Sequence, residues 1–221
     1  MKLLLDAAVK YTVGLLLVGG MLFAPAGSFY YANGWLFIGL LFIPMLLLGA
    51  VLLIRSPALL EKRLHAKEQE DTQKGVVAAS GLLFAVGFVV AGLDHRFGWS
   101  HVPTWVVIVA AVILLASYAL YAEVMRENTY LSRTIEVQKD QRVIDSGLYG
   151  IVRHPMYAVT VWLFLAIPIV LGSWWSLLCF LPYIAIIAVR IKNEEKVLQA
   201  GLEGYGDYQK RVKYRLFPFI W

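Results

Sequence analysis

The chain has 221 residues, of which 60% are hydrophobic and only 16% are charged. Soluble domains are about half apolar and about a quarter charged, so this composition excludes an ordinary soluble domain and predicts an integral membrane protein. The net charge of +5 fits loops that face anionic lipid headgroups, and it gives no reason to expect nucleic acid as a partner.

Six apolar stretches follow one another, most of them close to the ~17–20 residues that cross a bilayer. Four are predicted to span fully: Tyr11–Ala26, Trp35–Ile54, Val76–Leu93 and Thr104–Tyr121. Two shorter ones, Pro155–Leu171 and Trp174–Val189, are joined by Gly172-Ser173 alone, which predicts a tight antiparallel hairpin. The predicted fold class is all-α, a polytopic membrane helix bundle with four full spans and a C-terminal helical hairpin.

The basic residues predict the orientation of these helices. With four crossings and a final hairpin, all of the 20 Lys and Arg residues except Arg96 fall on one side. The positive-inside rule makes that side cytoplasmic, together with both termini, and in a bacterium the membrane would be the inner one. Asp6 and Lys10 interrupt any hydrophobic region that a signal peptide would need near the N-terminus, so we expect a retained helix instead of a signal peptide.

Polar residues concentrate in residues 124–221, whereas residues 1–123 are interpreted as N-terminal transmembrane helices. Because a hairpin begins and ends on one side, polar residues at its two ends are predicted to lie together. These residues are Arg153, His154, Pro155, Arg190 and Glu194. The sequence therefore predicts a polar site at the cytoplasmic ends of the last two helices, with residues 124–221 as the functional region.

Pro155 suits the first turn of a helix, where its missing N–H costs nothing. His154 then lies at the N-cap, where backbone N–H groups could hold a carboxylate. Arg190 and Glu194 are spaced i, i+4 and share a helix face, and a cation directly after an apolar run indicates a partner or a function. Taken singly, the Arg-His-Pro group is better explained by anchoring at the membrane interface, and the Arg190–Glu194 pair by an interfacial salt bridge.

Other common sites are not indicated by the sequence. No glycine-rich dinucleotide-binding or P-loop motif occurs. The four histidines, at positions 65, 95, 101 and 154, are spread over three predicted loops, and His95 and His101 lie on the opposite side from the other two, so no metal site is predicted. Cys179 lies in an apolar run and is interpreted as a packing residue. Asp94-His95-Arg96, on the opposite side, is either a capped loop or a feature of a particular family.

Several C-terminal motifs occur in a fixed order. They are Gln138, Val143-Ile144-Asp145-Ser146-Gly147-Leu148-Tyr149, Val152-Arg153-His154-Pro155-Met156-Tyr157, Arg190, Glu194-Glu195, Leu198, Tyr205-Gly206-Asp207-Tyr208, Arg211-Val212 and Pro218. This series resembles the isoprenylcysteine carboxyl methyltransferase family, within the integral membrane methyltransferases that also include phospholipid N-methyltransferases. The first four spans match only as hydrophobic helices.

The resemblance implies S-adenosyl-L-methionine as the cofactor and a lipid or prenylated acceptor, small molecule or protein, that is reached from the bilayer. The cofactor-binding residues it implies are Gln138, Gln141, Arg142, Val143, Ile144, Tyr149, Arg153, His154, Pro155, Met156, Tyr157 and Glu194. Arg190 would orient the substrate, and Glu195 is the second catalytic candidate. The oligomeric state stays open.

The activity that this resemblance favours is methylation of the carboxylate of an isoprenylcysteine-like substrate. Such a carboxylate is ionised at pH 7, so no general base is expected. The alternative acceptor is a phospholipid amine, for which Glu194 or Glu195 would assist. A non-catalytic transporter or scaffold is the alternative from another class, and a reductase that shares the membrane fold is a third possibility.

Overall fold

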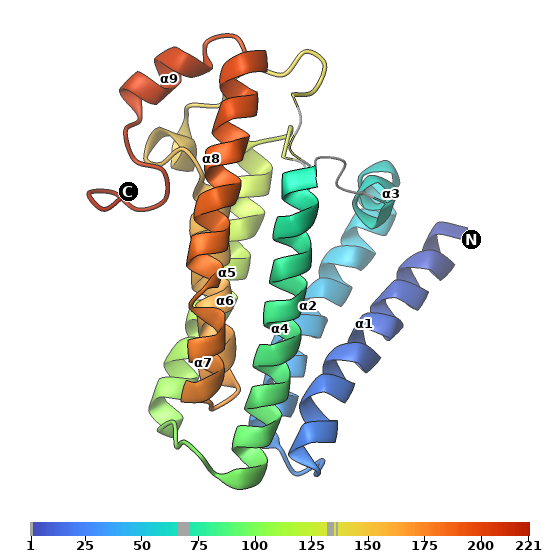
Figure 1. The fold of residues 1–221 in the computed structure, drawn as a ribbon. Coiled ribbons are helices and arrows are strands. Elements are labelled where there is room, and N and C mark those ends of the chain that lie inside the picture. Colours follow the sequence, from blue (N-terminus) through green and yellow to red (C-terminus); the bar gives the residue numbers. More distant parts are fainter. Residues whose placement is uncertain (1, 66–70, 132–134, 136) are drawn as a thin grey trace. The chain divides into compact units, whose positions relative to one another are not determined.

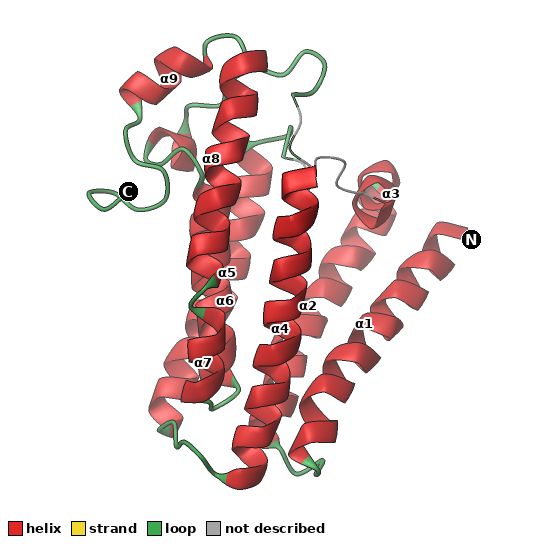
Figure 2. Cartoon of the chain, viewed as in Figure 1, coloured by secondary structure: helices red, strands yellow, loops and turns green. Residues whose placement is uncertain are grey.

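The computed structural model describes residues 2–65, 71–131, 135 and 137–221, which form helices, turns and loops without a strand among them (Figure 2). The α-helices, labelled in Figure 1, are α1 (Lys2–Ala26), α2 (Ala32–Arg55), α3 (Pro57–His65), α4 (Asp71–Phe97), α5 (Thr104–Glu127), α6 (Pro155–Val170), α7 (Trp174–Phe180), α8 (Tyr183–Gly201) and α9 (Tyr205–Arg211). A short 3₁₀ helix, η1 (Gly147–Gly150), precedes α6. The predicted all-α class is confirmed.

Five helical stretches in the described part of the chain are long and apolar enough to cross a membrane: α1, α2, Lys74–Phe97, α5 and Trp174–Gly201. A helix satisfies its own backbone hydrogen bonds, as a lipid environment requires. The 16 residues of α6 rise about 24 Å, which is less than the ~30 Å hydrocarbon core. The protein is therefore an integral, multi-pass membrane protein, and α6 is the short arm of the hairpin.

Several helices extend beyond the apolar stretches that predicted them. α1 begins at Lys2, α4 continues to Phe97, and α8 continues to Gly201. The prediction ended each helix near its first charged residue, but Glu, Lys and Arg are good helix formers outside the hydrocarbon. As a consequence Arg190 and Glu194 lie on one continuous helix. Lys67 and Arg133, which belong to the predicted cytoplasmic set, lie outside the described residues.

The chain divides into two compact units, each built from separate segments. Unit 1 comprises residues 1–66, 81–115 and 164–181, and unit 2 comprises residues 67–80, 116–163 and 182–221. The functional division between residues 123 and 124 stays a prediction.

Aromatic packing stabilises unit 1. The ring of Phe180 on α7 is fully buried and contacts Phe84 and Phe88 of α4, with ring centroids 5.2 and 6.1 Å apart. A Cβ atom on Gly87 would lie 2.2 Å from the Phe180 ring. Only glycine at this position therefore allows α7 to pack so closely on α4.

A second feature of unit 1 is a buried carboxylate, Asp94, in the last turn of α4. It is 2% exposed and accepts hydrogen bonds from the Ser100 backbone N–H at 2.7 Å and from the hydroxyls of Ser100 and Ser173, each at 2.5 Å. We call these three residues the Asp94 network. It joins the turn after α4 to the turn between α6 and α7, so the capped-loop interpretation of this region accounts for Asp94.

Unit 2 contains two small hydrophobic clusters. One consists of Leu202, Tyr205, Tyr208 and Val212, and the other consists of Val124, Tyr149 and Val159. Members of both clusters line one pocket. Unit 2 thus brings segments of α5, η1, α6, α8 and α9 together around this pocket.

Candidate active site

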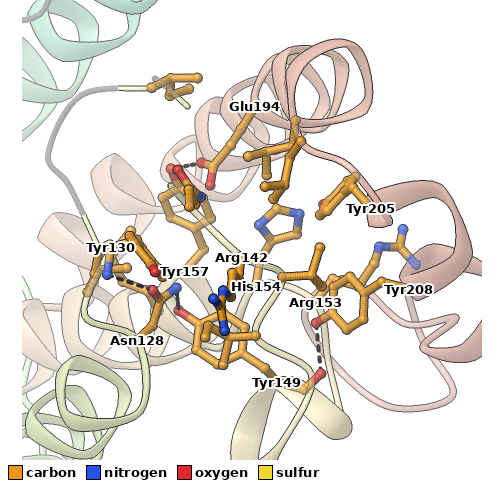
Figure 3. A pocket seen from close by; sticks show the side chains of 18 of the residues that line it. Asn128, Tyr130, Arg142, Tyr149, Arg153, His154, Tyr157, Glu194, Tyr205 and Tyr208 are labelled. Carbon is orange, nitrogen blue, oxygen red and sulfur yellow. Dashed lines mark hydrogen bonds between the residues drawn. The ribbon is translucent and has the colours of Figure 1, made fainter. Parts of the chain in front are cut away.

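A pocket in unit 2 gathers polar and aromatic side chains from the loop after α5, from η1, from the start of α6, and from α8 and α9 (Figure 3). Its lining residues are Asn128, Tyr130, Leu131, Ile135, Gln141, Arg142, Val143, Ile144, Tyr149, Arg153, His154, Met156, Tyr157, Arg190, Glu194, Leu198, Leu202, Tyr205 and Tyr208. Segments that are far apart in the sequence therefore meet at one site.

The start of α6 has the predicted form. Pro155 is its first residue, and the His154 carbonyl accepts hydrogen bonds from two backbone N–H groups one turn on. The backbone N–H groups of Arg153 and His154, however, donate to the carbonyls of Tyr214 and Arg215, each at 2.9 Å. These two groups hold the C-terminal tail, so neither of them is available to a ligand carboxylate.

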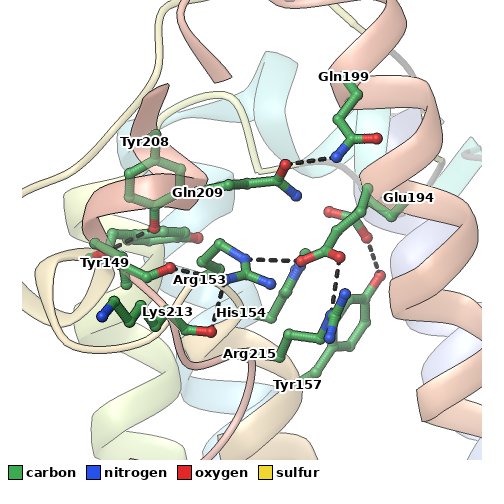
Figure 4. A network of polar contacts seen from close by, with 12 residues as sticks. Tyr149, Arg153, His154, Tyr157, Glu194, Gln199, Tyr208, Gln209, Lys213 and Arg215 are labelled. Carbon is green, nitrogen blue, oxygen red and sulfur yellow. Dashed lines mark hydrogen bonds and ion pairs between the residues drawn. The ribbon is translucent and has the colours of Figure 1, made fainter. Parts of the chain in front are cut away.

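The carboxylate of Glu195 is the centre of a buried ionic network, and its partners Arg153, His154 and Arg215 are labelled in Figure 4. Glu195 is 4% exposed and accepts hydrogen bonds from Arg153 Nε at 2.8 Å and Arg215 Nε at 2.9 Å, while His154 Nε2 lies 3.3 Å away. Arg153 also donates to the carbonyls of Val212 and Lys213. The network therefore fastens the C-terminal tail to α6 and α8, because charge-assisted bonds of this kind are the strong ones.

Arg190 and Glu194 of α8 meet at a tyrosine of α6. The buried Tyr157 hydroxyl donates to Glu194 Oε2 at 2.5 Å and accepts from Arg190 Nε at 2.9 Å. The spacing i, i+4 places both residues on one helix face, and the phenol bridges them. The pocket wall thus presents a fixed cation and a fixed carboxylate one helical turn apart.

The aromatic wall of the pocket is braced by η1. Gly147, with φ at +55°, leaves room for Glu127, whose carboxylate accepts the Leu148 backbone N–H at 2.9 Å. The Tyr149 hydroxyl accepts a hydrogen bond from the Asn128 side chain at 3.0 Å. Burial is the largest influence on this phenol and raises the pKa of Tyr149 to about 12, so it stays protonated at neutral pH.

The loop after α5 is held by its own side chains. The Gln138 side-chain amide donates to the Tyr130 carbonyl at 2.6 Å, and the Gln138 backbone N–H donates to the Gln141 side chain at 2.8 Å. Gln138 therefore shapes the loop, while Gln141 and Tyr130 line the pocket.

Most of the residues predicted from the sequence line this single pocket: Gln141, Arg142, Val143, Ile144, Tyr149, Arg153, His154, Met156, Tyr157, Arg190 and Glu194. The predicted residues Gln138, Pro155 and Glu195 are not among its lining residues. Gln138 braces the loop, Pro155 begins α6, and Glu195 holds three basic side chains. The functional roles of all these residues stay predictions.

Sequence reasoning assigned no role to several of the lining residues: Asn128, Tyr130, Leu131, Ile135, Leu198, Leu202, Tyr205 and Tyr208. A signal existed for some of them. Leu198 follows Glu194 by four residues and so shares its helix face, and Tyr205 and Tyr208 belong to the motif series. Asn128 and its neighbours lie in a loop, where no periodicity indicates which side chains point inward.

Comparison with known proteins finds a family model that covers most of the sequence around this pocket. Residues 102–205, just under half of the chain, match the family model described as phospholipid methyltransferase. The match confirms the resemblance to the integral membrane methyltransferases and supports a methyltransferase-type function in the membrane.

Two individual proteins are similar over part of the chain. Delta(14)-sterol reductase TM7SF2 from Mus musculus is 32% identical over 99 residues, which are 40% of this chain and 22% of that protein. The uncharacterized protein YpbQ from Bacillus subtilis (strain 168) is 30% identical over 97 residues, 43% of this chain and 58% of that protein. The chain thus spans less than two thirds of the length of either relative.

Proposed function

We propose that this protein is an S-adenosylmethionine-dependent methyltransferase that methylates the carboxylate of a lipid-linked, isoprenylcysteine-like acceptor. The observation that carries the proposal is the pairing of Arg190 with Glu194 through the Tyr157 hydroxyl, inside an aromatic pocket. This arrangement offers a cation to an anionic acceptor and a carboxylate to a cationic cofactor. The phospholipid methyltransferase match supports the same class of reaction.

The side chains of the pocket fit S-adenosylmethionine. The Glu194 carboxylate suits an ammonium group or ribose hydroxyls, and the faces of the tyrosine rings attract a positively charged group. Arg142, on the pocket wall, suits a carboxylate. The Tyr205 hydroxyl is buried without a hydrogen-bond partner among the described residues, as expected of a group that a ligand completes.

When bound, S-adenosylmethionine supplies an electrophilic methyl group on a positively charged sulfur. Arg190 would orient the acceptor carboxylate, and its Nε bond to Tyr157 limits how far the guanidinium can rotate. The acceptor is already ionised at pH 7, so the chain needs no proton-abstracting residue. Because the reacting charges cancel, walls that position the groups and exclude water favour the transfer.

The pocket would face the cytoplasm. This placement follows from the distribution of Lys and Arg over the loops and termini, of which Arg96 is the exception. The cofactor would then arrive from the cytoplasm and the lipid acceptor from the bilayer, with no role for nucleic acid.

A phospholipid amine is the second candidate acceptor, and the description of the matching family favours it. An amine must lose its proton before it attacks, so a base would be needed. Glu194 lines the pocket and could assist, whereas Glu195 is occupied by Arg153, His154 and Arg215. Sterol reduction is named for the mouse relative alone and is not proposed for this chain. A transporter or scaffold is not favoured, because it would need no ordered cofactor pocket.

The test is to incubate the protein with S-adenosylmethionine labelled on the methyl group and a membrane lipid extract. We expect a labelled lipid whose label is released by mild alkali, because a methyl ester hydrolyses and an N-methyl group does not. Arg190→Ala should lower this transfer roughly 10- to 100-fold, as loss of a charge-assisted bond of ~1.5–3 kcal/mol implies. A label that resists alkali would indicate an amine as the acceptor instead of a carboxylate. The absence of any labelled lipid would overturn the proposal.

A further inference from the structure

Tyr205 is the first residue of α9. Its side-chain hydroxyl is buried and lacks a hydrogen-bond partner in the described part of the chain. The residue is 4% exposed and lines the pocket (Figure 3). An unsatisfied buried polar group destabilises a protein, so native structures retain few of them and each requires an explanation. Its position on a pocket wall indicates that a bound ligand supplies the partner.

Tyr208, on the same short helix, provides an internal comparison. It also lines the pocket, its ring centroid is 5.7 Å from that of Tyr205, and it is 2% exposed. The Tyr208 hydroxyl, however, donates to the Tyr149 carbonyl at 2.7 Å. The two neighbouring phenols therefore differ in one respect. The Tyr208 hydroxyl forms a hydrogen bond within the protein, whereas the Tyr205 hydroxyl is available to form one with a ligand.

The surroundings of Tyr205 restrict what its hydroxyl can bind. Burial raises the pKa of Tyr205 above its ordinary value, the carboxylates of Glu195 and Glu194 raise it further, and Arg153 opposes them. The phenol therefore stays protonated and acts as a donor. Two nearby carboxylates also disfavour an anionic acceptor, so a neutral oxygen or ring nitrogen is the fitting partner.

We propose that Tyr205 binds the adenosine part of the cofactor, with its hydroxyl donating a hydrogen bond to a ribose oxygen or a ring nitrogen. This assignment rests on the proposed function, and it adds a residue for which the sequence predicted no role. The hydroxyl oxygen is covered, so the pocket wall yields locally as the nucleoside binds, through the side-chain rotations that are common at binding sites.

The experiment compares Tyr205→Phe with Tyr208→Phe in the full chain in detergent. Two quantities are measured: the melting temperature without ligand and the dissociation constant of S-adenosylhomocysteine. Tyr205→Phe removes an unsatisfied group, so we expect an unchanged or higher melting temperature and roughly 5- to 20-fold weaker binding. Tyr208→Phe removes a bond within the protein, so we expect a lower melting temperature.

The outcomes separate this assignment from the function on which it rests. If the native chain fails to bind S-adenosylhomocysteine, both are overturned. If the native chain binds it and Tyr205→Phe binds equally well, the role of Tyr205 alone is wrong. 5′-Methylthioadenosine, which lacks the amino-acid part, should lose affinity for Tyr205→Phe by the same factor, and a loss seen only with S-adenosylhomocysteine would contradict the adenosine contact.

Discussion

Among the described residues, each unit of this protein has one buried carboxylate side chain, and the two are held in different ways. Asp94 in unit 1 is bound by a backbone N–H and two hydroxyls, all of them neutral donors. Glu195 in unit 2 is bound by Arg153 and Arg215, with His154 alongside. Both carboxylates stabilise the fold. Only Glu195 has partners, Arg153 and His154, that line the same pocket as Arg190 and Glu194.

The difference shows how a buried charge should be interpreted. The Asp94 network lies between two turns of unit 1, and its described hydrogen bonds reach none of the residues that line the pocket in unit 2. The Glu195 network instead holds side chains that themselves line the pocket, namely Arg153 and His154. We therefore expect changes in unit 1 to affect stability alone, and changes around the pocket to affect ligand binding as well.

The largest effect is expected for Glu195→Ala, which leaves the buried guanidinium of Arg153 without its counter-charge. Breaking a buried ion pair from one side costs about 3–5 kcal/mol, so the free energy of unfolding should fall by about that amount. Thermal unfolding in detergent measures it. An unchanged melting temperature would contradict the role given to this network.

Glu194→Gln should affect ligand binding more than stability. Glutamine keeps the shape and can still accept a bond from Tyr157, but it loses the negative charge that suits a cationic cofactor. A charge-assisted bond contributes about 1.5–3 kcal/mol, which corresponds to roughly 10- to 100-fold weaker binding of S-adenosylmethionine. Isothermal titration would measure it, and equal affinity for both proteins would remove Glu194 from the binding site.

Asp94→Asn tests the comparison of the two buried carboxylates by changing the one in unit 1. The amide loses the charge and one acceptor, so a donor of the network loses its partner and stability should fall by about 1–3 kcal/mol. The dissociation constant of S-adenosylhomocysteine should stay within about twofold of the native value. A large loss of affinity with intact folding would show that the two networks do not act separately.

The smallest effect is expected at the surface of α9. Asp207 and Lys210 form an ion pair at 2.8 Å, and their side chains are 78% and 80% exposed. Solvent screens such pairs, so Asp207→Ala should change neither the melting temperature nor ligand affinity measurably. A clear loss of stability would mean that α9 is held more by charge than by Tyr205 and Tyr208.

Much of the fold could be predicted because hydrophobic length is a strong signal in membrane proteins. The four spans and the hairpin follow from apolar runs, and Pro155 marks the start of α6. Helix ends were missed because hydropathy does not report where a helix stops outside the lipid. α9 was missed for a related reason: its seven residues are largely polar and carry no apolar period.

The candidate site was only partly predictable, because a motif names residues but not their partners. Arg190, Glu194 and Tyr157 were all expected at the site, yet the phenol that bridges the other two could not be read from the sequence. Glu195 was assigned to catalysis for its position beside Glu194, whereas one step along a helix turns a side chain about 100° away. The tail carbonyls that occupy the helix start are likewise a tertiary feature.

The most direct test of the central claim is the affinity of the purified protein for S-adenosylhomocysteine, measured by titration calorimetry on the native chain and on Glu194→Gln and Asp94→Asn. We expect saturable binding at one site per chain, weaker binding by Glu194→Gln and native-like binding by Asp94→Asn. Failure of the native chain to bind the nucleoside, or equal loss in both variants, would contradict the assignment of the pocket in unit 2 as the cofactor site.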